Sequence, residues 1–358
     1  LIVKNTFMRN YWIIFLILVC SISCREINRS GTVTTILMDL ANMQDVDLHG
    51  DYATQICLMD GDSLALVDDV KKVLFAEGCY IVQGKNKLLS FDVRTGALKT
   101  SFSGQGRAVD EFVSLWEVWM DGDIVCLYDM NSKKVLRYDL DGTFLETIQT
   151  IEKAEGNPFQ TLAKMGKDFY VGKRVYSGME DVELNLYNKN LEFIKEIGDL
   201  KIESGIYLGY PFFVYRPDEV LYYRYLYNDI YSIDDKQHVS VKYYVDFGEN
   251  NVPFNPNLKD EYDRIDFVNN SRKKYATLVS NIYESEKYFC FSFLFDGRKC
   301  LGVYDKASGE SASFVFVSSS ESPRADVYVF DDTALVVTQD MDRTSLTTIK
   351  VDDLLKNN

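Results

Sequence analysis

The chain has 358 residues, a formal net charge of −15 and 14% aromatic residues, and its length suits one large domain. Because the acidic sequence contains no basic stripe, phosphate backbones would repel it, which argues against nucleic acid as a partner. The high content of Tyr and Phe is typical of β-proteins, in which aromatic side chains cover half-buried pleated surfaces.

A lipoprotein signal is predicted at the start of the chain. Lys4 and Arg9 precede the apolar run Tyr11–Val19, and residues 21–23 lead into Cys24. The run is too short for a membrane-spanning helix, which needs about 20 apolar residues. Small residues before a cysteine resemble the bacterial lipobox, which implies cleavage before Cys24 and attachment of lipid to it. An ordinary secretory signal is the alternative.

Six copies of one short pattern follow the signal. In each copy, an aromatic or aliphatic residue at the end of an apolar run precedes an acidic or amide residue and a turn; these residues are Asp92, Asp139, Asn188, Asp234, Asp305 and Asp352. They recur every 46 to 49 residues, apart from one spacing of 71 before Asp305. This period predicts an all-β fold, a six-bladed β-propeller of four-stranded antiparallel blades. We attribute the repeated acids to turn chemistry, because Asp accepts hydrogen bonds from backbone N–H groups in turns.

Short apolar strands separated by turns make up each unit. The units cover Val73–Phe102, Glu117–Ile148, Phe159–Ile197, Phe212–Phe247, Thr277–Val317 and Val327–Val351. The second unit is the clearest, because Asp-Gly pairs at 121–122 and 141–142 are the strongest short signal for a hairpin. The turn at 141–142 places Arg137 opposite Glu146 as an exposed ion pair.

The sixth unit contains only three strands. Because an unpaired edge in a ring would template aggregation, the missing outer strand is expected from the N-terminal segment. Val33–Met38 and Thr54–Met59 are the two candidates, and we favour the second because it lies nearer the first blade. The chain is therefore divided into a signal, residues 1–24, and a single propeller, residues 25–358.

The long spacing before Asp305 is explained by an insertion at residues 249–274. Asn255 before Pro256 is a signal for the start of a helix, since Asn caps the first turn and Pro fits its first position. The apolar residues that follow recur at the spacing of one helix face: Leu258, Tyr262, Ile265 and Val268. We expect a short amphipathic helix that packs over one face of the ring.

Five cysteines follow Cys24, and none belongs to a CxxC pair; they are Cys57, Cys79, Cys126, Cys290 and Cys300. A tight turn at Asp296-Gly297 pairs Phe295 with Arg298, which leaves Cys290 and Cys300 out of register. Disulfide geometry requires close Cβ atoms, so no bridge is expected between them. We interpret all five as small buried apolar residues.

Side chains suited to catalysis or metal binding are scarce. The two histidines, His49 and His238, have no partner at metal-ligand spacing, which argues against a zinc or copper site and against a Ser-His-Asp triad. The acids match no calcium loop, so we predict no metal and no cofactor. Paired carboxylates for glycoside cleavage remain an alternative. The Tyr-rich run from Tyr207 to Tyr231 is either a sugar platform or packing between blades.

Three stretches carry a family resemblance. A loop with Gly104, Gly106, Glu111 and Phe112, the strand and turn Val135–Gly142, and the segment Val245–Gly248 before the insertion resemble the six-bladed β-propeller lipoproteins of Bacteroidetes, a TolB-like or NHL-like group. The resemblance extends over nearly all of the chain after the signal. It implies an exported, outer-membrane lipoprotein with no assigned reaction.

A ligand site is predicted at one end of the channel of the propeller. Its candidate residues are Arg107, Asp110 and Glu111 in the glycine-rich loop, and Asp263 and Arg264 on the exposed side of the insertion helix. We predict a monomeric lipoprotein, held at the membrane only by lipid on Cys24, that binds or scaffolds a glycan, a peptide or an envelope protein without catalysis. The alternative is a propeller enzyme, a lyase or glycoside hydrolase, that uses carboxylates, Tyr and Arg at the channel mouth.

Overall fold

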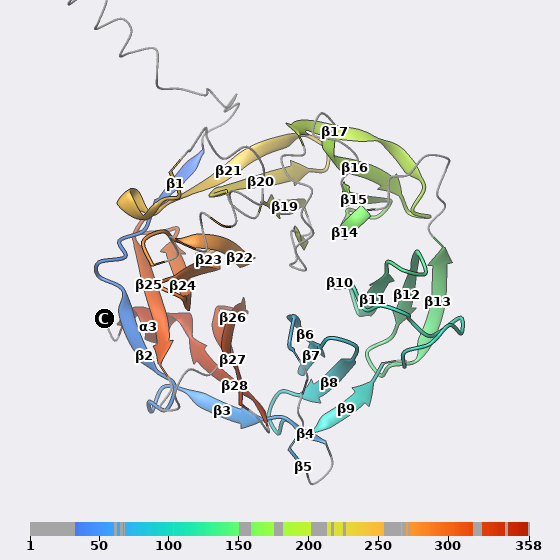
Figure 1. The fold of residues 1–358 in the computed structure, drawn as a ribbon, viewed down its shortest axis with the longest axis horizontal. Helices are drawn as coiled ribbons and strands as arrows, with labels where there is room; N and C mark the ends of the chain where they lie inside the picture. The colour runs from blue at the N-terminus through green and yellow to red at the C-terminus, as the bar shows by residue number, and fades with distance from the viewer. Residues whose placement is uncertain are drawn as a thin grey trace, which may run out of the picture.

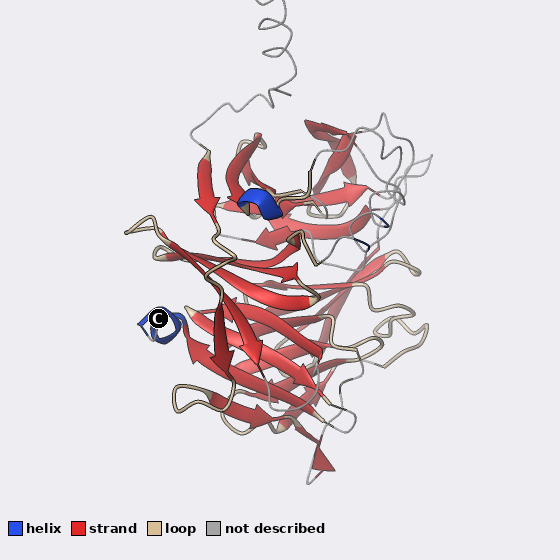
Figure 2. Cartoon of the chain, turned by 60° about the vertical axis from the view of Figure 1, so that its left-hand side comes forward, coloured by secondary structure: helices blue, strands red, loops and turns tan. Residues whose placement is uncertain are grey.

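The described part of the chain forms a closed ring of six β-sheets around one axis (Figure 1). The computed structural model describes residues 33–60, 63–64, 67, 69–102, 104–149, 159–174, 182–201, 213–215, 218–224, 227–253, 266, 270, 273–317, 324–340 and 343–356. Figure 2 shows that strands make up nearly all of this fold. A short 3-10 turn, η1 (Gly248–Asn250), and a short C-terminal helix, α3 (Val351–Lys356), accompany them. The predicted six-bladed propeller is confirmed.

Blades 1 to 3 each contain four consecutive antiparallel strands, as predicted. Blade 1 consists of β6 (Lys72–Ala76), β7 (Cys79–Gln83), β8 (Leu88–Asp92) and β9 (Leu98–Ser101). Blade 2 consists of β10 (Glu117–Asp121), β11 (Ile124–Asp129), β12 (Lys134–Tyr138) and β13 (Phe144–Gln149). Blade 3 consists of β14 (Phe159–Met165), β15 (Phe169–Arg174), β16 (Val182–Asn188) and β17 (Phe193–Lys201). In blade 2, Arg137 lies opposite Glu146 with 2.7 Å between the charged groups, as the turn at 141–142 predicts.

Blades 4 to 6 each receive a strand from the N-terminal part of the chain. Blade 4 consists of β18 (Phe213–Tyr215), β19 (Glu219–Tyr223), β20 (Asp229–Asp234), β21 (Val239–Asp246) and β1 (Thr34–Leu37). Blade 5 consists of β22 (Thr277–Glu284), β23 (Tyr288–Phe295), β24 (Arg298–Asp305), β25 (Ser311–Val317) and β2 (Gln44–Asp47). Blade 6 consists of β26 (Arg324–Phe330), β27 (Thr333–Gln339), β28 (Thr344–Lys350) and β3 (Thr54–Cys57). The prediction that Thr54–Met59 supplies the missing strand is confirmed.

The strands β1, β2 and β3, which we call the N-terminal belt, follow the outer rim of the ring over three blades (Figure 1). β1 and β2 pair in parallel with the outer strands β21 and β25, so blades 4 and 5 have five strands instead of the predicted four. Their side chains alternate as strand geometry requires: Ile36 and Val46 are buried, whereas Leu37 is 67% exposed. A small hairpin, β4 (Met59–Asp60) and β5 (Ser63–Leu64), follows the belt.

Turn chemistry explains five of the six repeated polar residues. Asp139 Oδ1 accepts hydrogen bonds from the backbone N–H groups of Asp141 and Thr143, at 3.1 and 2.7 Å. Asp92, Asn188, Asp234 and Asp305 accept backbone N–H groups in the same way after the third strand of their blades. These side chains satisfy backbone donors in the turn that leads into the fourth strand.

Asp352 is the exception, and its interpretation as a turn residue was wrong. It lies in the first turn of a short C-terminal helix, α3 (Val351–Lys356), where its carboxylate accepts hydrogen bonds from Lys287 Nζ at 2.5 Å and from the Tyr288 hydroxyl. Because β3 supplies the fourth strand of blade 6, the chain makes no turn after Asp352. The carboxylate instead attaches α3 to blade 5.

The five cysteines after residue 24 are free, as predicted. Cys290 lies opposite Val303 and Cys300 lies opposite Phe293, so the register keeps the two thiols apart. Four of the five are buried and Cys57 is half-buried. Burial raises the pKa of Cys126 to about 12, so this thiol stays protonated and unreactive near neutral pH.

Polar contacts join each blade to the next. Ion pairs cross five junctions: Lys72–Glu117 at 2.6 Å, Asp121–Lys164, Glu183–Arg224 at 2.9 Å, Lys242–Glu284 at 3.0 Å and Lys299–Asp326 at 3.5 Å. At the junction of blades 6 and 1, the Gln339 side-chain amide donates to the Val67 carbonyl at 2.6 Å. Apolar packing around Leu58, which is fully buried, completes this junction.

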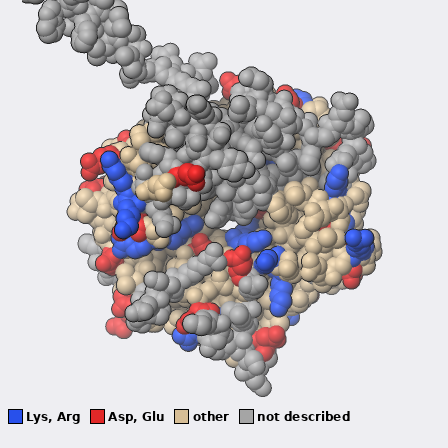
Figure 3. All heavy atoms as spheres, in the orientation of Figure 1, with Lys and Arg blue, Asp and Glu red and all other residues tan. Residues whose placement is uncertain are grey.

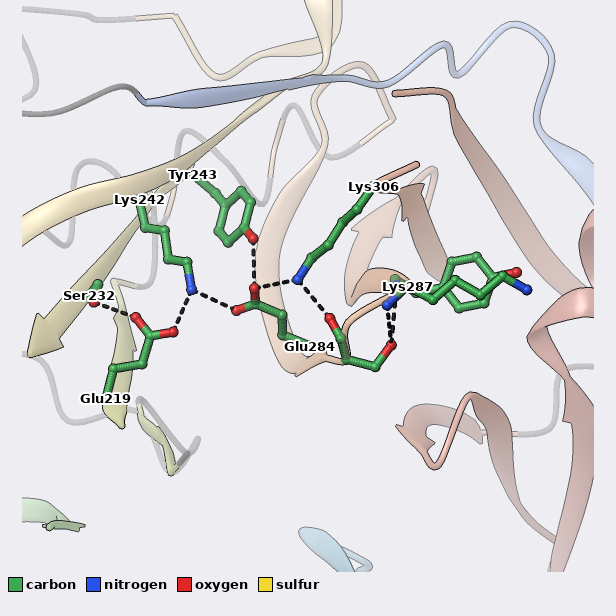
Figure 4. Close-up of polar contacts among 9 residues, drawn as sticks. Glu219, Ser232, Lys242, Tyr243, Glu284, Lys287 and Lys306 are labelled. Carbon is green, nitrogen blue, oxygen red and sulfur yellow. Dashed lines mark hydrogen bonds and ion pairs between the residues drawn. The ribbon is translucent and has the colours of Figure 1, made fainter. Parts of the chain in front are cut away.

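Glu284 is the centre of the polar contacts between blades 4 and 5 (Figure 4). Its side chain is 3% exposed and accepts hydrogen bonds from the Tyr243 hydroxyl at 2.7 Å, Lys242 Nζ at 3.0 Å and Lys306 Nζ at 2.5 Å. Lys242 also contacts Glu219, which balances its charge. Burial acts to raise the pKa of Glu284, but the donors from Lys306, Tyr243 and Lys242 outweigh it, and the pKa is lowered.

Two predicted segments lie largely or wholly outside the described residues. The signal at residues 1–24, including Cys24, is one of them. The helical insertion at 249–274 is the other: a 3-10 turn, η1 (Gly248–Asn250), spans its start, and farther along Asp266 and Asn270 are helical and exposed. Among the described helices, none is long and apolar enough to span a membrane.

We predict that Leu58→Ala opens the closing junction. Leu58 is fully buried between blades 1 and 6, so its truncation should lower the free energy of unfolding by about 2–5 kcal/mol. Leu37→Ala, at an exposed position on β1, should change it by less than about 0.5 kcal/mol. Urea unfolding of both variants measures the difference, and equal effects would contradict the role of Leu58.

A second prediction concerns the acid sensitivity of Glu284. Glu284→Gln should lower the free energy of unfolding by about 1–3 kcal/mol at pH 7, because it removes the charged acceptor of two lysines. Since the folded pKa of Glu284 is lowered, its contribution is complete above the unfolded pKa, about 4.3, and disappears as the pH falls through the folded pKa. The difference between wild type and variant should therefore shrink below about pH 4.5. Glu286→Gln, at an exposed neighbour, is the control, and a difference independent of pH would contradict the prediction.

Candidate ligand site in the central channel

The first strands of all six blades surround a cavity of about 230 Å³ on the axis of the ring. β6, β10, β14, β22 and β26 are seen around the centre in Figure 1. Because the first strand of each blade lies nearest the axis, residues far apart in sequence meet here. The aromatic residues of the wall are Phe75, Trp119, Phe213, Tyr223, Tyr328 and Phe330, and the polar ones are Lys72, Glu117, Thr161, Lys164 and Asn281.

One chain of polar contacts connects blades 1, 2 and 3 at the cavity. Lys72 Nζ donates to Glu117 Oε1 at 2.6 Å and to the Val118 carbonyl at 2.8 Å. The other carboxylate oxygen, Glu117 Oε2, accepts the Thr161 hydroxyl at 2.7 Å. Glu117 is 6% exposed, so these contacts satisfy a carboxylate that water scarcely reaches.

A second network holds Lys164. Its amino group contacts Asp121, which also pairs with Arg137 at 3.1 Å, and Arg137 in turn pairs with Glu146. The two cations and two anions balance, so this network adds no net charge near the cavity. Figure 3 shows both signs of charge around the hollow at the centre of this face.

The aromatic wall extends across the closing junction. Phe75 of blade 1 stacks on Phe330 of blade 6, with ring centroids 6.2 Å apart, and Phe330 stacks on Tyr328 at 6.2 Å with an interplanar angle of 8°. Farther around the ring, Trp119 makes an edge contact with Tyr170 at 6.3 Å. Trp119 is 6% exposed, and its Nε1–H has no hydrogen-bond acceptor within the described part of the chain.

The strand that carries Asn281 is irregular where it lines the cavity. β22 loses register twice against β23, and Leu278 and Asn281 adopt positive φ angles of 58° and 47°. Such angles are strained for side chains other than Gly, and bulges of this kind are frequent beside binding sites. Burial raises the pKa of the Tyr223 hydroxyl, against a hydrogen bond with the backbone of Asn281, so it remains neutral.

The predicted site residues of the glycine-rich loop do not line the cavity. Glu111 accepts the backbone N–H of Ala108 at 2.8 Å, the Asp110 carbonyl accepts the Tyr138 hydroxyl at 2.6 Å, and Arg107 is exposed. The structure thus brings Arg107, Asp110 and Glu111 together in one turn. Their role in ligand binding stays a prediction, and Asp263 and Arg264 lie outside the described residues.

Asp129 fixes the end of this loop. Its buried carboxylate accepts backbone N–H groups from Val113 at 2.7 Å and Ser114 at 3.1 Å. Burial acts to raise the pKa of Asp129, but hydrogen bonds from Val113, Ser132 and Ser114 outweigh burial, and the pKa is lowered. The carboxylate therefore serves as an anchor for backbone rather than as a proton donor near neutral pH.

The Tyr-rich run contributes mainly to packing. Among its described members, Phe213, Tyr222, Tyr223 and Tyr231 are buried and Tyr227 is half-buried, which favours the packing interpretation over an exposed sugar platform. His238 contacts Asp234 at 3.3 Å on the surface. Within the ranges described above, no three His, Cys, Asp or Glu side chains gather closely enough to hold a metal ion.

The cavity residues could not be identified from the sequence as a set. Lys72 and Glu117 are polar residues at the starts of β6 and β10, and they are 45 positions apart. The available signal was their position, since each opens the first strand of its unit. That signal becomes specific only when the first strands are known to face one channel.

Comparison with other proteins supports the fold. Residues 60–357 match the family described as a domain of unknown function, DUF4934, whereas curated proteins give no match. An exported protein of Bacteroides fragilis shares 13% identity and a TM-score of 0.65, over 89% of this chain and 99% of that one. A DUF4221 family member from Bacteroides vulgatus shares 9% identity and a TM-score of 0.53, over 83% and 96%. At these identities the likeness concerns the fold alone.

Proposed function

The chain belongs to the DUF4934 family, whose description assigns no activity, and we propose that it is an exported, lipid-anchored binding module without catalytic activity. The central cavity carries this proposal, because it is a preformed concave site with a mainly apolar wall and a few fixed polar groups. The ligand classes expected from the sequence are a glycan, a peptide or an envelope protein. The module acts as a monomer.

The chemistry of the wall supports binding over catalysis. Glycoside cleavage uses two carboxylates, whereas Glu117 is the single acid in the described wall and is already paired with Lys72. Burial keeps the Tyr223 hydroxyl protonated near neutral pH, so it is a poor base for elimination. Lysine, glutamate and threonine at the cavity are engaged in contacts that hold neighbouring blades together.

Sequence and fold together support an envelope location. The signal-like segment ends at Cys24, and the similar fold from Bacteroides fragilis belongs to a protein described as exported. Lipid on Cys24 would connect the membrane to β1 on the outer rim of blade 4. We place the anchor in the outer membrane, as the family resemblance implies.

Lipid attachment gives a direct prediction. When the full gene is expressed in a Bacteroides host with a clickable palmitate analogue, the wild-type chain should take up label and sediment with membranes. Cys24→Ala should lose both properties, while Cys57→Ala should keep them, because Cys57 lies within the ring. Equal labelling of the Cys24→Ala variant would contradict the anchor.

The binding role is tested with residues 25–358, which retain all described contacts. Fluorescently labelled protein is applied to glycan and peptide arrays, and Leu74→Trp serves to fill the cavity from β6. We expect Leu74→Trp to weaken binding at least about tenfold, since the added ring occupies the ligand's volume. Leu145→Trp, at a 48% exposed position on the outer strand β13, should bind as wild type.

Two outcomes would count against the proposal. Binding that Leu74→Trp leaves intact would move the site away from the cavity. If the wild-type protein converts an array ligand chemically, and the Glu117→Gln variant folds normally but no longer converts it, the enzyme alternative is favoured.

A further inference from the structure

We infer that the central cavity is selective for a neutral aromatic group of one or two fused rings, borne by a small molecule or by a peptide side chain. The inference rests on the proposed function, because it takes the cavity as the ligand site, and it narrows the ligand to one chemical class. Three properties of the wall carry it: the stacked rings, the charge balance and the volume.

The stacked rings at the closing junction form a flat apolar surface. Phe75 and Phe330 are half-buried residues of the wall, and their rings lie 27° from parallel. Aromatic rings prefer offset stacks and edge contacts with centroids about 4.5–7 Å apart. A guest ring beside Phe75 and Phe330 would extend the stack that Tyr328 and Phe330 already form.

Charge balance disfavours an ionised ligand. The lining cations Lys72 and Lys164 pair with Glu117 and Asp121, and Arg137 and Glu146 complete a neutral set. A charged guest would lose its hydration without gaining an uncompensated partner, which is costly in an apolar site. A sugar is disfavoured for a related reason, because Thr161 and Asn281 already donate to Glu117 and to the Val327 carbonyl.

The volume of the cavity defines the guest further. A cavity of about 150 Å³ lined by apolar residues holds benzene, so 230 Å³ suits one or two fused rings. Trp119 lines this cavity and adds a further aromatic side chain to its wall.

The test compares matched ligands on residues 25–358 by isothermal titration calorimetry and saturation-transfer NMR. Benzyl alcohol and indole are the neutral aromatic probes, benzoate and benzylamine are charged probes of similar size, and glucose is the sugar. We expect the neutral aromatic probes to bind at least about tenfold more tightly than the charged ones. The peptide acetyl-Gly-Trp-Gly-amide tests whether a peptide side chain reaches the cavity. If it binds more tightly than indole, the natural guest is a peptide side chain; if it binds more weakly, the natural guest is a small molecule.

Two variants test whether the cavity is the site. Leu74→Trp should weaken indole binding at least about tenfold, because the added ring fills the cavity. Leu145→Trp, at an exposed position, should bind indole as wild type. Circular dichroism and thermal unfolding verify that both variants fold.

The outcomes distinguish the two proposals. If neutral aromatics fail to bind at millimolar concentration, or benzoate binds as tightly, the ligand class is wrong. In that case, if Leu74→Trp still abolishes the binding of an array ligand, the cavity remains the binding site. If Leu74→Trp changes neither array binding nor indole binding, both proposals fail.

Discussion

The pairing of β3 with β28 is the constraint on which the ring depends. Five junctions between blades carry ion pairs within the described residues, whereas the junction of blades 6 and 1 is held by β3, by the Gln339–Val67 hydrogen bond and by apolar packing around Leu58. The stacked rings of Phe75 and Phe330 cross this same junction. Closure therefore does more than remove an open edge, since it also assembles one wall of the cavity.

The ion pairs explain how an acidic, aromatic-rich chain can enclose a nearly neutral site. Lys72 and Lys164 pair with acids from neighbouring blades and so serve the assembly of the ring. Glu284 does the same between blades 4 and 5, with two lysines and a tyrosine as donors. Because these charged side chains pair with one another at the junctions, the aromatic residues determine which ligands the cavity favours.

Features with local or periodic causes could be predicted from the sequence. The repeated Asp and Asn residues predicted six blades, the turn at 141–142 placed Arg137 opposite Glu146, and the missing strand of blade 6 required a partner from the N-terminal segment. The pairing of β1 and β2 escaped prediction, because each strand has four residues, precedes the first repeat and pairs with an edge that exists only in the assembled ring. The interpretation of Asp352 was wrong for a related reason. Its sequence matches the repeat, but it is followed by the helix α3 and not by a turn into a fourth strand. The cavity could not be predicted, because it forms only where the first strands of all six blades meet, and no single repeat contains that information.

The N-terminal belt also sets the order in which the ring would yield to mechanical load. From the N-terminus, the strands are β1, then β2, then β3, and each lies on a different blade. Under the proposed anchoring through Cys24, tension applied at the N-terminus would have to separate β1 from β21 and β2 from β25 before it reached β3, the strand that keeps the ring closed. Pulling from that end would therefore detach the first two strands while the ring and its channel stay intact.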